Sequence, residues 1–394
     1  MTTPRVTYVL TKYVQPTQTF VTGEIAELRR QGVEVEVVAM ERGEVSPPPD
    51  ERVVVLADEH PPRSQLLREH LAAFGRRPLG YLAFLVDVRR LRSEMGRRPE
   101  QVPWTLLPGV AGRLRGTALH AHFAWSGAAA ALLLAHLTGR PWSVTVHAND
   151  IFNRQRNVAR KLAAADRLVT VCDYNVSWMR THLGLSRHVD LVVCGVEPPI
   201  APWASEPGAD VLVVGRLVEK KGIDVLVRAT ALLRADHPAM QVHVIGEGRE
   251  RAALEALIRE LGVEDCVHLL GARCHEESLA RIAGARVLCL PARIARDGDR
   301  DSMPVVIKEA MARRVPVVAT DIVAIPEMLG DGCGVMVPPD DPAALATALA
   351  RLLDGPADAE AVVDRAYARV LERFTLAGET AKLRALLLPG GTAA

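Results

Sequence analysis

Short runs of β-branched and other apolar residues alternate with helix-length stretches throughout this chain, and that alternation restricts the fold more than any other feature. Strands are predicted at Val6–Leu10, Val33–Ala39, Val53–Leu56, Leu119–His122, Ser143–His147, Leu168–Val171 and Leu191–Cys194, and then at Val211–Gly215, Gln241–Ile245, Val267–Leu270, Val287–Leu290, Pro316–Ala319 and Gly334–Val337. Helices are predicted at Phe20–Gln31, Gly222–Leu233, Glu250–Leu261 and Pro304–Arg313. Strands separated by helices of this length indicate right-handed βαβ units and therefore parallel sheets.

The length of 394 residues favours two domains, because a single hydrophobic core rarely grows that large. The stretch Glu197–Asp210 is rich in Pro, Ala and Ser and separates the two series of strands, so it is interpreted as a linker. We therefore expect an N-terminal domain at 1–200, a C-terminal domain at 208–375, and a last helix and tail at 376–394 that return to the N-terminal domain. Two doubly wound sheets facing across a cleft would bind ligands at the carboxyl ends of their strands.

Composition and charge exclude several classes of function. The net charge is only +1, so no basic surface for nucleic acid is indicated. The six cysteines form no C-x-x-C pair and no cluster at zinc spacing, which favours a reducing, cytoplasmic compartment. The N-terminus lacks the pattern of a signal peptide. The most apolar stretch, Ala124–Leu137, has about 14 residues, whereas a membrane span needs about 20, so a buried helix is predicted.

Residues 60–100 differ from the rest because arginines are interleaved with Leu, Phe and Tyr. The arginines are Arg63, Arg68, Arg76, Arg77, Arg89, Arg90, Arg92, Arg97 and Arg98. A basic amphipathic helix pair of this kind would contact an anionic membrane or a phosphorylated acceptor. The alternative interpretation is a solvated basic face.

The first chemical motif follows the strand at Val211–Val214 and reads G-R-L-V-E-K-K-G, from Gly215 to Gly222. The glycines relieve crowding at the end of the strand and at the turn into the next helix. Arg216 and Lys221 then project from the loop, and two cations there suit a diphosphate. An exposed basic turn is the alternative.

The second motif is acid, seven residues, acid, running from Asp301 to Glu309. Pro304 is suited to start a helix, and the free N–H groups of a helix start bind anions such as pyrophosphate. Glu309 would accept from ribose hydroxyls, and Asp301 would contact sugar hydroxyls. Alternatively, Asp301 is only an N-terminal cap and Glu309 only a surface acid.

The order of these two motifs, with V-I-G-E-G at Val244–Gly248 between them, resembles the retaining GT-B glycosyltransferases of family GT4. The resemblance implies a GT-B fold of two doubly wound Rossmann-like domains facing across a cleft. It implies that Arg216 and Lys221 hold the donor diphosphate, that Asp301 contacts the transferred sugar and that Glu309 binds the ribose. The other donor-binding residues it implies are Gly215, Gly246, Glu247, Gly248, Ser302, Met303, Pro304 and Val305.

The first half of the chain is similar to exopolysaccharide glycosyltransferases of the colanic-acid and amylovoran type. The similar segments are Tyr13–Phe20, Gly23–Leu28, H-A-H-F-A at His120–Ala124 and T-V-H-A-N-D-I at Thr145–Ile151. The resemblance places His147 beside the donor sugar as a catalytic residue, and Gln15, Thr17 and Gln18 are expected to face the acceptor. His120 and His122 share one face of a strand, and a metal role for them would need partners that the sequence does not reveal.

Two local features depart from the family pattern. Asp301 stands where the family has Glu, which shortens its reach by about 1.3–1.5 Å. Asp297-Gly298-Asp299 spells D-x-D, a metal motif of another glycosyltransferase fold, but it lies in a polar loop and is interpreted as loop.

The predicted function is a metal-independent, retaining transfer of a sugar from a UDP- or GDP-linked donor, with no further cofactor. The acceptor is expected to be a hydroxyl of a saccharide, a lipid-linked saccharide or a natural product. The alternatives are a sugar-nucleotide hydrolase or epimerase of the same fold, and a non-catalytic sugar-binding protein. A dinucleotide-dependent dehydrogenase is disfavoured because no G-x-G-x-x-G follows a strand.

Overall fold

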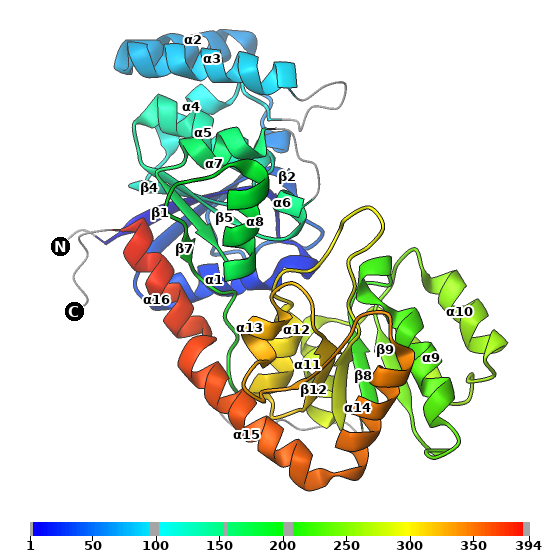
Figure 1. Cartoon of the computed structure of the whole chain (residues 1–394). Helices are drawn as coiled ribbons and strands as arrows, with labels where there is room; N and C mark the ends of the chain where they lie inside the picture. Colours follow the sequence, from blue (N-terminus) through cyan, green and yellow to red (C-terminus); the bar gives the residue numbers. More distant parts are fainter. Residues whose placement is uncertain (1–2, 95–101, 153–156, 200–207, 389–394) are drawn as a thin grey trace. The chain divides into compact units, whose positions relative to one another are not determined.

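A computed structural model describes residues 3–94, 102–152, 157–199 and 208–388 (Figure 1). The chain divides into two compact units. Unit 1 comprises Met1–Val193 and Glu379–Ala394, and unit 2 comprises Cys194–Gly378. The predicted linker falls mostly on residues 200–207, which lie outside the described residues, as does the tail from 389 onward.

Unit 1 is built on a seven-stranded parallel sheet in the order β3-β2-β1-β4-β5-β6-β7. The strands are β1 (Arg5–Tyr13), β2 (Glu34–Arg42), β3 (Val53–Val55), β4 (Ala118–His122), β5 (Trp142–Val146), β6 (Arg167–Thr170) and β7 (Asp190–Leu191). The connecting helices are η1 (Pro16–Gln18), α1 (Thr19–Arg30), η2 (Leu56–Asp58), α2 (Arg63–Arg76), α3 (Pro78–Glu94), α4 (Leu107–Arg113), α5 (Ser126–Thr138), α6 (Asn149–Phe152), α7 (Val158–Ala164) and α8 (Asp173–Leu183).

The core of unit 1 forms two buried apolar clusters. The larger one contains the apolar residues of α5, which is buried along most of its length, as its composition predicts. The other gathers most of the apolar residues of β1, β2 and α1, together with Leu383 and Leu387 of α16 (Leu376–Leu387). Because the chain returns to unit 1 at Glu379, the last helix completes a core that the first strand begins.

Unit 2 is built on a six-stranded parallel sheet in the order β10-β9-β8-β11-β12-β13. The strands are β8 (Val211–Val214), β9 (Val242–Ile245), β10 (Val267–Gly271), β11 (Val287–Leu290), β12 (Val317–Thr320) and β13 (Val335–Val337). The helices are η3 (Glu219–Lys221), α9 (Ile223–Leu233), α10 (Arg251–Glu260), α11 (His275–Gly284), α12 (Val305–Ala312), α13 (Ile325–Leu329), α14 (Pro342–Asp354) and α15 (Pro356–Arg373). Two Rossmann-like parallel sheets confirm the predicted fold class.

The strand order reverses once in each sheet. In unit 1 the reversal lies between β1 and β4, and in unit 2 it lies between β8 and β11. Loops that leave the carboxyl ends of two such neighbouring strands turn in opposite directions, and ligands of open α/β sheets bind at that point. The topology therefore directs attention to the loops after β1, β4, β8 and β11.

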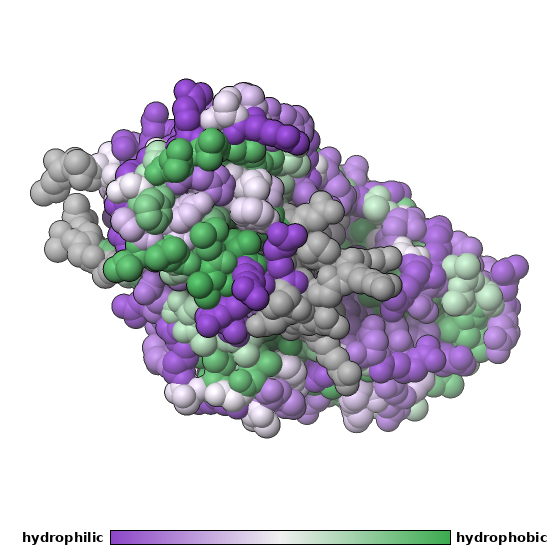
Figure 2. Space-filling model, turned by 90° about the horizontal axis from the view of Figure 1, so that it is seen from above, coloured by the Kyte–Doolittle hydropathy of each residue, from purple (hydrophilic) through white to green (hydrophobic). Residues whose placement is uncertain are grey.

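The arginine-rich stretch forms α2 and α3, which lie as an outer layer over α4 and α5 (Figure 1). Large apolar side chains on both helices are exposed: Leu67, Leu71, Phe74, Leu79, Leu82, Leu85 and Val86. Figure 2 looks onto this side of unit 1 and shows apolar residues gathered there beside hydrophilic ones. We call this the α2–α3 surface. No helix among the described residues is long and apolar enough to cross a membrane.

Candidate functional site

The loop after β8 carries the first of the predicted donor residues. Gly222 has φ +61°, and a Cβ there would lie 1.8 Å from the carbonyl oxygen of Pro291, so only glycine fits this turn. Arg216 is exposed, and its guanidinium forms no hydrogen bond or ion pair with any residue that the structure describes. The loop therefore presents one cation at the end of β8 that is available to a ligand.

Lys221 and its neighbour Lys220 are instead paired with acids from the loop after β11. Lys221 Nζ lies 2.5 Å from Asp301 Oδ2, and Lys220 Nζ lies 3.1 Å from Asp301 Oδ1 and 3.0 Å from Asp299 Oδ1. Burial opposes ionisation of Asp301, but the two ammonium groups outweigh it and hold the pKa of that carboxyl well below its usual range. Ion pairs thus connect the loop after β8 to the loop after β11 at the point where the strand order reverses.

This pairing bears on the interpretation of Asp301 as a helix cap, whereas its contact with a sugar stays a prediction. The residue at the N-cap of α12 is Pro304, and no side chain caps the helix. The interpretation of Asp301 as a helix cap is therefore wrong, because its carboxylate is engaged by lysines. Asp299, the last residue of the D-x-D sequence, has the same kind of role and binds Lys220.

The start of α12 lies directly after these acids. Ser302, Met303 and Pro304 are buried, and the helix begins at Val305. The first N–H groups of a helix have no acceptor within it and carry partial positive charge. An anion held by Arg216 and Lys221 would find further donors at such a helix start.

Glu309 is the fifth residue of α12, and its carboxylate is only 13% exposed. His275, the first residue of α11, places Nε2 2.7 Å from Glu309 Oε1. Glu309 therefore has a histidine partner, and its contact with a ribose stays a prediction. Sequence reasoning missed His275 because it lies 34 residues before Glu309 and belongs to no spaced motif.

The glycines of V-I-G-E-G bring the loop after β9 against the loop after β8. A Cβ on Gly246 would lie 1.9 Å from the Gly215 carbonyl oxygen, and one on Gly248 would lie 2.3 Å from that of Leu217. Glu247 accepts from Leu217 N through its carbonyl, and its carboxylate pairs with Arg251. The structure thus gives these residues a role in loop packing, and their contact with a donor stays a prediction.

In unit 1, His147 follows the end of β5 and is 8% exposed. Its Nε2 lies 3.1 Å from Nδ1 of His122, and its ring packs against Phe20 and Phe123, with centroids 4.9 and 4.5 Å away. The backbone N–H of His147 donates to Asp150 Oδ1 at 2.8 Å. His147 is therefore held on its main chain and on its ring.

Asp150 was not singled out from the sequence, although it follows His147 by three residues in a motif that was. Its second oxygen accepts from the backbone N–H of Ala124 at 2.8 Å, so one carboxyl ties the loop after β4 to the loop after β5. Complete burial raises its pKa to about 6, against the lowering effect of the backbone donors.

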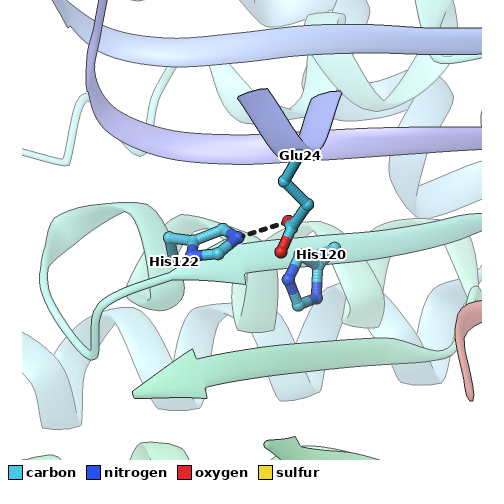
Figure 3. Close-up of side chains that lie close together, drawn as sticks. All are labelled: Glu24, His120 and His122. Atoms are coloured by element: carbon cyan, nitrogen blue, oxygen red, sulfur yellow. Dashed lines mark hydrogen bonds and ion pairs between the residues drawn. The ribbon is translucent and has the colours of Figure 1, made fainter. Parts of the chain in front are cut away.

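His120 and His122 point from β4 toward Glu24 of α1 (Figure 3). His122 Nε2 lies 2.8 Å from Glu24 Oε1, which also accepts from the Tyr8 hydroxyl at 2.7 Å. His120 contacts Ser143 Oγ, and burial first, then His122 and His147, lowers its pKa well below the usual value. Ligand atoms of these three residues lie within 4.8 Å of one another, so Glu24 is the partner that the sequence did not reveal.

A cavity of about 160 Å³ lies at the carboxyl ends of β1 and β4. It is lined by Leu10, Thr11, Lys12, Gln15, Gln18, His122, Phe123 and Trp125. Gln15 is 9% exposed, and its carboxamide has no hydrogen-bond partner among the described residues. Thr17 is exposed and does not line the cavity, so two of the three predicted acceptor residues are brought together.

Trp125 is the residue of this cavity that sequence reasoning missed. It is stacked on Phe123, with centroids 4.3 Å apart and planes inclined by 6°. The signal was available in the segment that follows His120, where two aromatics flank one alanine. Stacked aromatic faces and an unpaired carboxamide are suited to binding a flat apolar face with hydroxyl groups at its rim.

Comparison with known proteins gives two family matches along the chain. Residues 17–198 match the model described as Glycosyltransferase Family 4, and residues 208–355 match the model described as Glycosyl transferases group 1. The two matches cover most of both units.

Among curated relatives, the amylovoran biosynthesis glycosyltransferase AmsK of Erwinia amylovora is 38% identical over 165 residues, which cover 42% of this chain and 40% of the relative. The chain thus spans less than half the length of this relative. The putative colanic acid biosynthesis glycosyltransferase WcaL of Escherichia coli K12 is 28% identical over 94% of this chain and 96% of its own.

Solved structures share the fold at low identity. Sucrose-phosphate synthase from Thermosynechococcus elongatus superimposes with a TM-score of 0.70 at 20% identity, covering 97% of this chain and 98% of the other. HepE of Anabaena in complex with UDP gives a TM-score of 0.70 at 16% identity, covering 97% and 99%.

Proposed function

Because this chain belongs to the group 1 and family 4 glycosyltransferases and has their GT-B fold, we propose that it transfers a sugar from a UDP- or GDP-linked donor with retention of configuration and without a metal ion. The acceptor is a hydroxyl group of a saccharide, a lipid-linked saccharide or a natural product. The observation that carries the proposal is the charged junction of Arg216, Lys221 and Asp301 at the strand-order reversal of unit 2.

We assign each donor residue a role that its charge and position support. Arg216 and Lys221 bind the diphosphate, and the start of α12 donates to the same oxygens. Lys221 must then share its ammonium group between the diphosphate and Asp301, to which it is paired without ligand. Asp301 turns toward the transferred sugar, and Glu309 accepts from the ribose in place of His275.

The chemical step breaks the bond between the anomeric carbon and the leaving phosphate oxygen. The acceptor oxygen forms its new bond on the same face of the sugar, and the leaving phosphate oxygen takes the acceptor proton. The cations contribute most where charge grows on the leaving diphosphate. No group of the protein has to form a covalent intermediate in this scheme.

The cavity of unit 1 supports an acceptor with hydroxyl groups. Gln15 and Gln18 supply amide donors and acceptors, and Trp125 supplies an apolar face. Relatives named for amylovoran and colanic acid biosynthesis favour a saccharide or a lipid-linked saccharide as the first acceptor to test. His147, on the same unit, is proposed to contact the transferred sugar.

Peripheral contact with an anionic membrane is part of this proposal. Among the side chains of α2, α3 and the residue between them that the structure describes, the exposed charged ones are all basic: Arg63, Arg68, Arg76, Arg77, Arg89, Arg90 and Arg92. Both acids between Arg63 and Arg92, Glu69 and Asp87, are half-buried, and the Asp87 carboxylate contacts His136 and Arg90. Exposed leucines beside exposed arginines are the composition of a helix that lies in a lipid interface.

The donor assignment is tested by binding and turnover in parallel. A panel of UDP- and GDP-sugars is screened by thermal shift, and the stabilising donor is then incubated with and without saccharide acceptors. We expect one donor to raise the melting temperature, because a ligand of the folded state stabilises it. We expect Arg216→Ala to weaken binding of that donor by about 1.5–3 kcal/mol, the range for a hydrogen bond to a charged group.

The matched control is Arg259→Ala, which removes an exposed arginine from α10 of the same unit and is expected to leave donor binding unchanged. If the donor is hydrolysed as fast without an acceptor as with one, the chain is a sugar-nucleotide hydrolase and not a transferase. Equal donor affinity in the wild-type and Arg216→Ala chains would refute the assigned diphosphate site.

A further inference from the structure

Three side chains of unit 1, those of Glu24, His122 and His147, form a continuous hydrogen-bonded chain. Glu24 Oε1 lies 2.8 Å from His122 Nε2, and His122 Nδ1 lies 3.1 Å from His147 Nε2. The side chain of His122 is 1% exposed and that of Glu24 is 13% exposed, so water competes little for these bonds. The residues come from α1, β4 and the loop after β5.

The carboxylate of Glu24 determines which group donates in each of these hydrogen bonds. An ionised carboxylate only accepts hydrogen bonds. Burial, and then Glu24, raise the pKa of Tyr8 well above its usual value, so the Tyr8 hydroxyl keeps its proton and donates to Glu24. His122 must likewise donate to Glu24 through Nε2–H. A neutral His122 then has no proton on Nδ1 and accepts from Nε2–H of His147.

A metal ion is the competing explanation for the cluster of Glu24, His120 and His122. The contacts favour the hydrogen-bonded chain, because both ring nitrogens of His122 already face protein partners at hydrogen-bond distance. His120 is also engaged, since its Nδ1 lies 2.8 Å from Ser143 Oγ and its Nε2 lies 3.3 Å from Thr145 Oγ1. A metal would have to replace these bonds.

We propose that Glu24 and His122 are positioning residues that hold His147 in the tautomer protonated on Nε2. In that tautomer Nδ1 of a neutral His147 has the chemistry of a hydrogen-bond acceptor, which suits a hydroxyl group of the transferred sugar and not an oxygen of the diphosphate. This role toward the sugar rests on the proposed function. The tautomer itself is a property of the ligand-free protein and is tested without any substrate.

The first test records long-range ¹H–¹⁵N correlations of ¹⁵N-histidine-labelled, ligand-free protein, with His147 assigned by its absence in His147→Gln. Wild-type His147 is expected to be a single tautomer protonated on Nε2. Its ring signals are expected to change in His122→Phe, which keeps the ring packing but removes the acceptor. An Nδ1-protonated His147 in the wild-type chain, or unchanged signals in His122→Phe, would overturn the proposal.

The second test measures donor KM and kcat for transfer. Glu24→Ala and His122→Phe are expected to lower kcat by about tenfold to a hundredfold, as expected for a misplaced catalytic group, with donor KM changed less. His122→Asn places a carboxamide near the position of the His122 Nδ1 atom and is expected to recover part of the lost kcat. Tyr8→Phe, which leaves the chain from Glu24 to His147 intact, is the matched control.

The outcomes separate the two proposals. A wild-type chain without transferase activity that still shows the single His147 tautomer would refute the proposed function and leave the positioning role standing. An active chain in which Glu24→Ala matches the wild type would refute the positioning role alone. If one equivalent of zinc is retained on purification and is lost in Glu24→Ala, the cluster is a metal site and not a hydrogen-bonded chain.

Discussion

Asp150 joins two loops of unit 1 through backbone amides, and its burial has a consequence for stability. The carboxyl accepts from the N–H groups of Ala124 and His147, both within the segments that present the histidines. Its pKa is about 6 in the folded chain and about 3.9 in an unfolded one. The folded state therefore binds the proton more tightly than the unfolded state does.

A raised carboxyl pKa contributes stability that is fully present below about pH 3.9 and is lost as the pH rises through about 6. Asp150→Asn cannot titrate, so the stability of the wild-type chain relative to this variant should increase as the pH falls from about 7 to about 5, by at most about 1.4 kcal/mol per pH unit. Urea unfolding of both chains at each pH measures this difference.

Asp166→Asn is the matched control, because Asp166 also accepts from a backbone amide, that of Trp142, but is exposed. If the difference in free energy of unfolding between the wild type and Asp150→Asn does not vary with pH, Asp150 stays ionised throughout this range. The backbone donors would then outweigh the effect of burial on its pKa.

At the scale of elements, α2 and α3 differ from every other helix pair of unit 1 in what they leave uncovered. Leu79 is 83% exposed and Leu82 is 51% exposed on α3, which packs against α2 and α5. Leaving such side chains in water forgoes about 25 cal/mol for each Å² of apolar surface that could be buried. A lipid interface would cover them and would also neutralise the arginines.

We expect the chain to sediment with phosphatidylglycerol-containing vesicles and not with pure phosphatidylcholine, and to be released by salt, because screened arginines lose their attraction to anionic lipid. Leu79→Asp/Leu82→Asp should weaken this binding by about tenfold or more, since both apolar area and net positive charge fall. Leu232→Asp, at a leucine that is 56% exposed on α9 of unit 2, is the control. Binding that survives the double substitution would exclude the α2–α3 surface as the contact.

At the scale of the whole molecule, the chain leaves unit 1 after Val193 and returns to it at Glu379. The return is fixed by polar and apolar contacts. Glu379 Oε2 accepts from Val193 N at 2.7 Å, and Leu383 is completely buried in the cluster that contains Val6 and Tyr8. The stability of unit 1 therefore depends on residues at the opposite end of the sequence.

Leu383→Ala should destabilise unit 1 by about 2–5 kcal/mol, the usual cost of a large-to-small change in a core. Leu371→Ala on α15 makes the same change at a position that is 51% exposed, and should cost no more than about 0.5 kcal/mol. Urea unfolding gives the size of the effect, and limited proteolysis identifies the unit that loses protection. Equal costs for the two variants, or loss of protection in unit 2 alone, would contradict this role for α16.

The sequence by itself was sufficient to predict the layered βαβ organisation, because strand and helix periodicities are local and recur over short spans. It also located the loops after β8 and β11, since glycines, cations and acids follow the ends of apolar runs there. The family resemblance then assigned these residues to a donor, and that assignment is carried forward as a proposal.

Only the tertiary structure decided which of these residues meet. Asp301 lies 80 residues from Lys221, Glu24 lies 98 residues from His122, and His275 lies 34 residues from Glu309. Residues this far apart in sequence come together because of the order of the strands and the placement of the helices. Local residue spacing does not encode either of these. Two of the predicted donor residues, Lys221 and Asp301, are thus paired with each other, and His122 of β4 is paired with a carboxylate on α1.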